Sequence, residues 1–147
     1  MIKLKPVFIT GIYKTPKNLL PAHMAQLHPD VIDKFYAFVQ DVKRAGGKVV
    51  ISDMFRSWKM QANAHKAKGK LAVPSGTSYH EAGLAFDVAL TEIGIPYKTF
   101  EGIAKKHGIE SGASWKKREP WHFQFSWKKL GCKSLKEAIR DVGNLAA

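Results

Sequence analysis

Hydrophobic residues recur every three or four positions between residues 29 and 44. They are Val31, Phe35, Phe38 and Val42. This spacing places the four side chains on one face of a helix. Acidic residues lie near the start of the segment and basic residues near its end, as the helix dipole favours, and two glycines follow. The pattern therefore predicts an amphipathic helix that ends before Gly46.

Two later segments alternate between large apolar residues and small or polar ones, which is the period of a strand. Between residues 84 and 90 the apolar positions are Leu84, Phe86, Val88 and Leu90, and the others are Ala85, Asp87 and Ala89. Between residues 121 and 126 the apolar positions are Trp121, Phe123 and Phe125, and the others are His122, Gln124 and Ser126. The alternation predicts two strands that each bury one face in the core. It directs Asp87 and His122 to the other face, where small neighbours leave room beside the carboxylate.

Further elements follow from local signals. The β-branched run at 48–55 predicts a strand of roughly five residues. Ser57 can cap a helix over 58–69 that ends at Gly69, and a loop rich in glycine, serine and proline follows at 71–83.

Two more helices are predicted near the C-terminal end. One runs from a cap at Thr99 to a stop at Gly108. Ser134 and Glu137 have the spacing of a capping box and start the last helix. No repeat or linker separates these elements, so we expect one domain over residues 1–147.

Composition and charge indicate a globular protein with a negatively charged partner. The chain has 147 residues, of which 45% are hydrophobic, and this is enough for one core. Lys and Arg outnumber Asp and Glu by 24 to 12, so a polyanionic partner is favoured, either nucleic acid or an anionic bacterial envelope. The lysines are scattered in pairs, which is typical of a solvated basic surface.

The N-terminal segment is relevant to where in the cell the protein is held. Pro6 interrupts its short apolar patch, and no run has the length of a signal sequence or a membrane span. Cys132 is the single cysteine, so an internal disulfide is impossible. We therefore expect the protein to be cytoplasmic on synthesis and to act after release.

Candidate chemistry centres on His80, Asp87 and His122. The seven-residue separation of His80 and Asp87 is not specific by itself, because His23 and Asp30 share it. Two imidazoles and one carboxylate are, however, a ligand set of catalytic zinc sites that keep a fourth position for water. Such a site also needs a carboxylate that moves protons without binding the metal, and Glu119 lies three residues before His122.

Other residues have simpler interpretations. Trp121 could stack on a substrate, but its alternation with two phenylalanines favours core packing. His65 fits a solvated helix face. Four further residues receive no role: His23, His28, His107 and Cys132.

Two motifs carry a resemblance to a known family. The run GTSYHEAGLAFDV resembles the S-x-H-x-x-G-x-A-x-D signature of the zinc D-alanyl-D-alanine carboxypeptidases and L-alanyl-D-glutamate endopeptidases of peptidase family M15, which include phage endolysins, and EPWHFQ resembles their E-x-x-H signature. ISDMFRSWKMQ is similar to the family's strand-end arginine followed by a helix with a glutamine. The resemblance covers about residues 30–126.

The resemblance implies roles for named residues. His80, Asp87 and His122 would bind Zn²⁺, and Glu119 would be the general base. Arg56 would contact a substrate carbonyl or carboxylate, although a surface ion pair is the ordinary role of such an arginine. Ser78 would lie beside the metal and contact substrate, or else stabilise the loop through a local hydrogen bond.

The implied fold is a single α+β domain of the Hedgehog/DD-peptidase type, with a small, mainly antiparallel sheet and helices packed on one side. The expected function is zinc-dependent cleavage of peptidoglycan stem peptides by a monomer, between L-Ala and D-Glu as in a phage or prophage endolysin. D-Ala-D-Ala carboxypeptidase or dipeptidase activity is the alternative. A zinc-containing binding domain and a basic nucleic-acid-binding domain are the non-enzymatic alternatives, the latter disfavoured because no nucleic-acid recognition motif is present.

Overall fold

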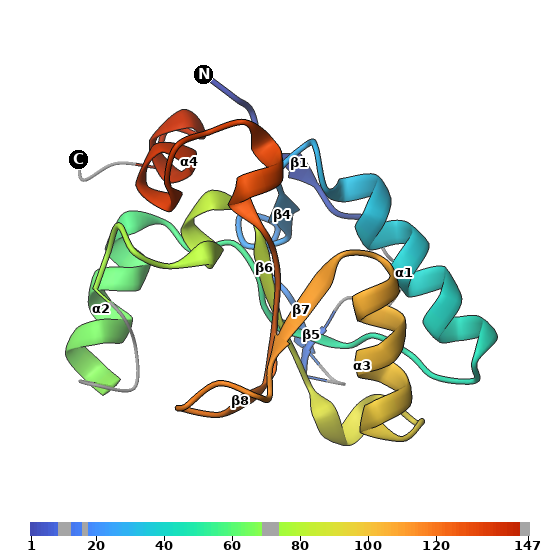
Figure 1. Ribbon diagram of the computed structural model, residues 1–147. Helices are drawn as coiled ribbons and strands as arrows, with labels where there is room; N and C mark the ends of the chain where they lie inside the picture. The colour runs from blue at the N-terminus through green and yellow to red at the C-terminus, as the bar shows by residue number, and fades with distance from the viewer. Residues whose placement is uncertain (9–12, 16–17, 69–73, 145–147) are drawn as a thin grey trace.

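The computed structural model describes residues 1–8, 13–15, 18–68 and 74–144 (Figure 1). Its helices are α1 (Ile32–Arg44), α2 (Trp58–Lys68), α3 (Tyr97–Lys106) and α4 (Leu135–Asp141). The described residues also contain the short 3-10 helices η2 (Tyr79–Ala82), η3 (Leu90–Glu92) and η4 (Trp127–Leu130). Two small antiparallel pairs join β1 (Lys5–Pro6) to β4 (Gln26–Leu27) and β2 (Tyr13–Thr15) to β3 (Asn18–Leu19).

The main sheet is antiparallel throughout, with the order β5-β6-β8-β7. Its strands are β5 (Ile51–Asp53), β6 (Ala85–Val88), β7 (Ile109–Gly112) and β8 (Glu119–Phe125). In the pairing of β6 with β8, Phe86 lies opposite Phe123 and Asp87 lies opposite His122. The sheet therefore places a core pair and a polar pair side by side.

Helices α1 and α3 cover the apolar face of this sheet (Figure 1). The rings of Phe86 and Phe123 stack at 5.7 Å between centroids, and Phe35 of α1 meets Phe86 edge-on at 5.0 Å. Phe100 of α3 closes the cluster 5.3 Å from Phe123. Each fully buried phenylalanine contributes about 1.5–3 kcal/mol relative to an exposed one. This aromatic layer fixes the strands that carry Asp87 and His122.

Helices α2 and α4 lie on the other side of the sheet, next to η2 (Figure 1). The buried side chain of Asn144 joins these parts. Its oxygen accepts from the Trp58 N–H at 2.7 Å, and its amide donates to the carbonyls of Arg56 and Glu81 at 2.9 and 3.0 Å. Asn144 thus ties the start of α2 to the turn that contains His80.

The predicted helices are present, with some changes at their starts. Ser57 caps α2 as predicted, since its Oγ accepts from the Met60 N–H at 3.2 Å, whereas the predicted stop at Gly69 lies outside the described residues. Helix α3 begins earlier than Thr99, at Tyr97 after Pro96, whose fixed φ suits a helix start. Ser134 caps α4 by accepting from the Glu137 N–H at 3.1 Å.

The strand at Asp87 is shorter and more enclosed than its alternation predicted. It ends at Val88, and Leu90 lies in η3. Ala85 is fully buried, but the predicted room beside the Asp87 carboxylate is present, because Asp87 lines an open cleft. Ala85 is buried because β6 is an inner strand and η2 packs beside it.

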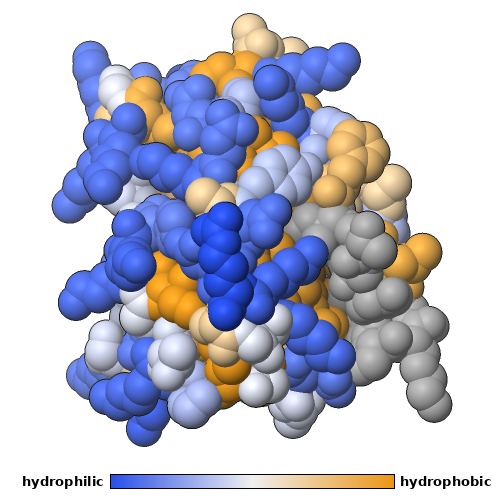
Figure 2. Space-filling model, turned by 90° about the vertical axis from the view of Figure 1, so that its right-hand side faces the viewer, coloured by the Kyte–Doolittle hydropathy of each residue, from blue (hydrophilic) through white to orange (hydrophobic). Residues whose placement is uncertain are grey.

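The surface agrees with the interpretation of scattered basic residues. Figure 2 views the side on which α1 and α3 lie; hydrophilic residues cover much of it, and hydrophobic surface shows between them. The exposed basic residues of these two helices are Lys34, Lys43, Arg44, Lys98, Lys105 and Lys106. Among the described residues, no helix has the length and apolar character to cross a membrane.

Candidate metal centre

Three elements bring the predicted ligands together. His80 lies in η2, Asp87 in β6 and His122 in β8. Gly83 makes the turn from η2 into β6 with a φ of 69°, and a Cβ there would lie 2.9 Å from the His28 backbone nitrogen. Only glycine fits this turn without strain, and the turn returns the chain so that His80 faces Asp87.

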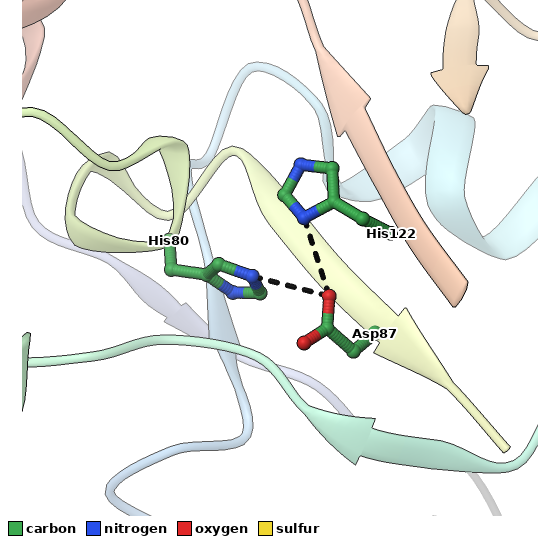
Figure 3. Close-up of side chains that lie close together, drawn as sticks. All are labelled: His80, Asp87 and His122. Atoms are coloured by element: carbon green, nitrogen blue, oxygen red, sulfur yellow. Dashed lines mark ion pairs between the residues drawn. The ribbon is translucent and has the colours of Figure 1, made fainter. Parts of the chain in front are cut away.

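The two imidazoles point at one carboxylate oxygen (Figure 3). His80 Nε2 and His122 Nδ1 each lie 3.2 Å from Asp87 Oδ1. One ligand atom from each residue lies within 4.8 Å of the others, and all three residues are buried. Within the described part of the chain, no other group of histidine, cysteine and acidic residues meets these criteria.

Hydrogen bonds at the far side of each ring indicate which nitrogen carries a proton. His80 Nδ1 lies 2.5 Å from the Met54 carbonyl oxygen, which can only accept, so Nδ1 is the donor. His122 Nε2 lies 2.8 Å from Gln124 Oε1, which likewise accepts. The nitrogens that face Asp87 are then left with lone pairs.

This arrangement fits a zinc ion. Asp87 Oδ1 is buried and has no hydrogen-bond partner among the described residues, while two imidazole nitrogens approach it. Burial alone would raise the pKa of Asp87, but His80 and His122 outweigh this effect and hold it below its usual range, so the carboxylate stays ionised. Three converging donors of this type match a catalytic zinc site with an open fourth position.

A capping box holds the loop that carries His80. Ser78 Oγ accepts from the His80 N–H at 3.2 Å, which is the local role considered for Ser78. The carboxylate of Glu81 accepts from the backbone N–H groups of Gly76 and Ser78 at 2.9 and 3.2 Å. Glu81 is fully buried, and this burial raises its pKa despite those bonds. Sequence reasoning missed Glu81, although its S-x-x-E spacing from Ser78 was the available signal.

Arg56 borders the centre. Its Nε and Nη2 lie 2.7 and 2.6 Å from Asp53 Oδ2, and its Nη1 donates to Gln61 Oε1 at 3.0 Å. Nη2 also lies 3.5 Å from Asp87 Oδ2. Arg56 therefore forms ion pairs, as its ordinary role predicted. These pairs are largely buried and lie beside the candidate ligands, not at the open surface. Substrate contact by Arg56 stays a prediction.

Glu119 reaches the neighbourhood of His122 through an irregularity in β8. Uninterrupted pairing of β7 with β8 would place Gly112 opposite His122, yet Gly112 pairs with Glu119. Tyr97 supports the bulged segment by donating its hydroxyl to the Pro120 carbonyl at 2.7 Å. Burial lowers the pKa of His122, but the adjacent Asp87 carboxylate and the nearby Glu119 charge raise it overall. The E-x-x-H spacing thus brings the two side chains into electrostatic contact.

An open cleft of about 690 Å³ lies beside the centre, and Arg56, Asp87 and Trp121 are among its lining residues. Trp121 is 42% exposed, so the prediction that it packs in the core is wrong. The bulge explains the difference, because it interrupts the regular alternation just before Phe123. The remaining alternative for Trp121, stacking on a substrate, is compatible with its position.

The other histidines lie elsewhere. His28 is buried and its Nδ1 accepts from the Asp30 N–H at 3.0 Å, while His107 Nε2 lies 2.6 Å from Asp41 Oδ2 between α3 and α1. Cys132 is a free thiol near the Trp127 carbonyl. None of these residues joins the group at Asp87, as expected.

A family model described as VanY, D-alanyl-D-alanine carboxypeptidase, matches residues 24–128. The protein belongs to this family. The matched range includes the whole candidate centre, from Arg56 to His122. A search of curated proteins gave no match.

Solved structures agree with this family assignment at the level of the fold. The LdcB LD-carboxypeptidase matches with a TM-score of 0.64 and 18% identity, covering 92% of this chain and 77% of LdcB. A variant of the vancomycin-resistance D,D-pentapeptidase VanY in complex with Zn(II) has a TM-score of 0.59 and 14% identity, covering 95% and 85%. The Serratia marcescens L-Ala D-Glu endopeptidase ChiX has a TM-score of 0.55 and 18% identity, covering 72% and 85%.

The VanY family assignment confirms the predicted resemblance and the predicted fold class. The helices, however, lie on both sides of the sheet and not on one side as predicted, since α2 and α4 lie opposite α1 and α3. This family member therefore has the fold of the M15 peptidases that act on peptidoglycan, built on a small antiparallel sheet. The predicted cofactor, zinc, is supported by the His–Asp–His group and by the zinc complex of the VanY variant.

Proposed function

We propose that the protein is a zinc-dependent peptidoglycan peptidase whose metal ligands are His80, Asp87 and His122. The observation that carries this proposal is the approach of two imidazole nitrogens to the buried, otherwise unbonded Asp87 Oδ1. Without a cation, this arrangement would leave lone pairs facing a carboxylate, which is costly in a buried site. The open cleft at Asp87 gives a peptide access to the centre.

In this proposal, Glu119 transfers protons and Arg56 stabilises negative charge. When bound, zinc would supply Lewis-acid polarisation of the scissile carbonyl and acidify a water. A carboxylate oxygen of Glu119 takes a proton from the attacking water and returns it to the leaving amine. Arg56 lies at the cleft with Nη2 directed to Asp87 Oδ2, and its guanidinium stabilises negative charge on the carbonyl oxygen.

We favour cleavage within the stem peptide, between L-Ala and D-Glu. An endopeptidase must accommodate substrate on both sides of the scissile bond. Asp87 lines the first cleft, and a second cavity of about 650 Å³ is lined by Trp115, whose ring centroid lies 5.0 Å from that of His122. Space at Asp87 and space at Trp115, a ring neighbour of His122, support an extended substrate. The alternative, removal of terminal D-Ala, is favoured by the name of the matching family.

The source and site of action belong to the same proposal. The formal charge of +12 favours attraction to an anionic cell envelope. A phage or prophage endolysin that is held in the cytoplasm and reaches the cell wall after release would use this attraction to concentrate on its substrate.

The decisive experiment is digestion of purified peptidoglycan with wild-type protein and Glu119→Gln, followed by mass spectrometry of the fragments. New amino termini on D-Glu support the endopeptidase, and released D-Ala supports the alternative. Glu119→Gln should lower the cleavage rate at least 100-fold, on the order of the general-base contribution. Glu92→Gln is the matched control, since Glu92 is partly exposed and pairs only loosely with Lys48 at 3.9 Å. Equal rates for wild type and Glu119→Gln would refute the assigned base.

A metal measurement tests the ligands separately. His80→Ala should lose most bound zinc, whereas His23→Ala, which changes an exposed histidine, should retain it. Full zinc occupancy in His80→Ala would remove His80 from the site.

A further inference from the structure

A polar chain leads from His122 across one face of the sheet to the protein surface. His122 Nε2 lies 2.8 Å from Gln124 Oε1, and Gln124 Nε2 donates to Glu110 Oε1 at 2.5 Å. Glu110 and Gln124 are direct partners in the pairing of β7 with β8, so the strand register sets this contact. Gln124 is buried, while Glu110 is exposed at the second cavity.

The order of donors and acceptors along this chain is fixed at its outer end. A carboxylate can only accept, so Glu110 takes the amide N–H of Gln124. The Gln124 oxygen must then face His122, where it requires an N–H on Nε2. This requirement leaves Nδ1, the nitrogen 3.2 Å from Asp87 Oδ1, with its lone pair. The Glu110 carboxylate thus selects the tautomer of a histidine that it does not touch.

We propose that Glu110 and Gln124 are positioning residues that hold His122 in the tautomer able to bind a metal through Nδ1. The proposal rests on the assignment of His122 as a ligand under the proposed function. Partners at the outer nitrogen of a metal-binding histidine fix its orientation and tautomer, and their loss commonly weakens metal binding 10–100-fold. His80 has a backbone carbonyl in this role, whereas His122 depends on two side chains.

A purely structural role explains the pair less well. A buried amide is costly unless both its ends are bonded, and an apolar side chain would fill the same space without that requirement. Gln124 uses its oxygen on His122 and its nitrogen on Glu110, so its hydrogen bonds link the centre to a single surface carboxylate.

The test reverses the order of the chain by changing only its exposed end. In Glu110→Lys, the ammonium group can only donate, so the Gln124 oxygen turns toward it and the amide N–H faces His122 Nε2. That arrangement favours the proton on Nδ1. We expect the zinc dissociation constant, measured by chelator competition, to rise 10–100-fold. In ¹⁵N-labelled zinc-loaded protein, the protected Nε2–H signal of His122 should be lost.

Two further variants separate the order of donors from other effects. Glu101→Lys is the charge-matched control, because Glu101 lines the same cavity but bonds to Ser111. It should leave the zinc dissociation constant and the Nε2–H signal unchanged. The double variant Glu110→Gln with Gln124→Glu exchanges the two groups, so that an amide at 110 donates to a carboxylate at 124 that still accepts from Nε2–H. It should bind zinc within about threefold of wild type.

Different results would overturn the role of Glu110 and the proposed function. Unchanged zinc affinity and an unchanged Nε2–H signal in Glu110→Lys would overturn the proposal, as would equal weakening by Glu101→Lys or failure of the exchanged pair to bind zinc well. Wild-type protein that binds zinc but cleaves no peptidoglycan would refute the proposed function and leave this test intact. Absence of zinc binding by wild type would refute both.

Discussion

Arg56 Nη2 lies 3.5 Å from Asp87 Oδ2, the carboxylate oxygen that the two histidines do not approach. One oxygen of Asp87 therefore faces the candidate metal position and the other faces a guanidinium. Asp53 holds Arg56 in this position from the neighbouring strand β5. The same arginine lines the open cleft, so it connects the candidate ligands to the space where a substrate would bind.

Replacing Arg56 with lysine should impair catalysis more than metal binding. A lysine keeps the charge but loses the planar fork that contacts Asp53, Gln61 and Asp87 together. We expect kcat/KM for peptidoglycan fragments to fall about 100-fold, the scale for loss of one oxyanion donor, while zinc content stays near one ion. Arg44→Lys is the control, because Arg44 forms an exposed pair with Asp41. Wild-type kinetics in Arg56→Lys would show that this fork takes no part in the reaction.

The candidate ligands could be predicted from sequence because their chemistry is local. His80 and Asp87 lie in one motif, and the alternation around His122 placed it on the polar face of a strand. A strand neighbour then needs only the correct register to bring Asp87 opposite His122. The aromatic core followed from the same alternation, since Phe86 and Phe123 occupy the apolar positions.

Features that depend on long-range contacts were not predicted. The bulge at Pro120 exposes Trp121, and a regular alternation of apolar and polar residues does not predict a bulge. Asn144 bonds to residues far away in sequence, and such a contact has no local signature. Burial of Ala85 depends on what covers an inner strand. These features are set by packing between elements and not by the pattern within one element.

Trp121 should contribute to substrate binding and little to stability. It lies on the cleft and is substantially exposed, so its removal leaves no large cavity in the core. In Trp121→Ala we expect KM to rise about tenfold, within the range for loss of an aromatic contact, and the free energy of unfolding to change by less than about 1 kcal/mol. Phe8→Ala is the control, as Phe8 is an exposed aromatic residue that does not line the cleft. A large loss of stability with unchanged KM would contradict this role.

Glu81 should matter for both folding and zinc binding. Its carboxylate satisfies the backbone N–H groups of Gly76 and Ser78 inside the loop that carries His80. Glu81→Ala leaves these buried donors without partners, at a cost of about 1–3 kcal/mol in the free energy of unfolding. Urea denaturation of the metal-free protein measures this loss, and chelator competition should show weaker zinc binding. Glu137→Ala removes the corresponding residue of the cap on α4 and should spare zinc affinity.

The contact between Asp41 and His107 lies away from the candidate metal centre. It should make the free energy of unfolding depend on pH. The hydrogen bond from His107 is the main reason that the pKa of Asp41 is lowered, and the bond joins α1 to α3. A lowered pKa means that the ionised carboxylate is favoured in the folded state. Its contribution is therefore complete above the unfolded-state pKa of roughly 4 and is lost as the pH falls through the folded-state value.

Asp41→Asn should accordingly be less stable than wild type at pH 7, and the difference between the two proteins should shrink as the pH falls below roughly 4. Urea denaturation of metal-free wild type and variant from neutral to acidic pH provides the measurement. Asp33→Asn on the same helix is the control for general loss of a negative charge, and its difference from wild type should lack this decline. A gap for Asp41→Asn that stayed constant down to pH 2 would mean that the bond with His107 does not favour the ionised form.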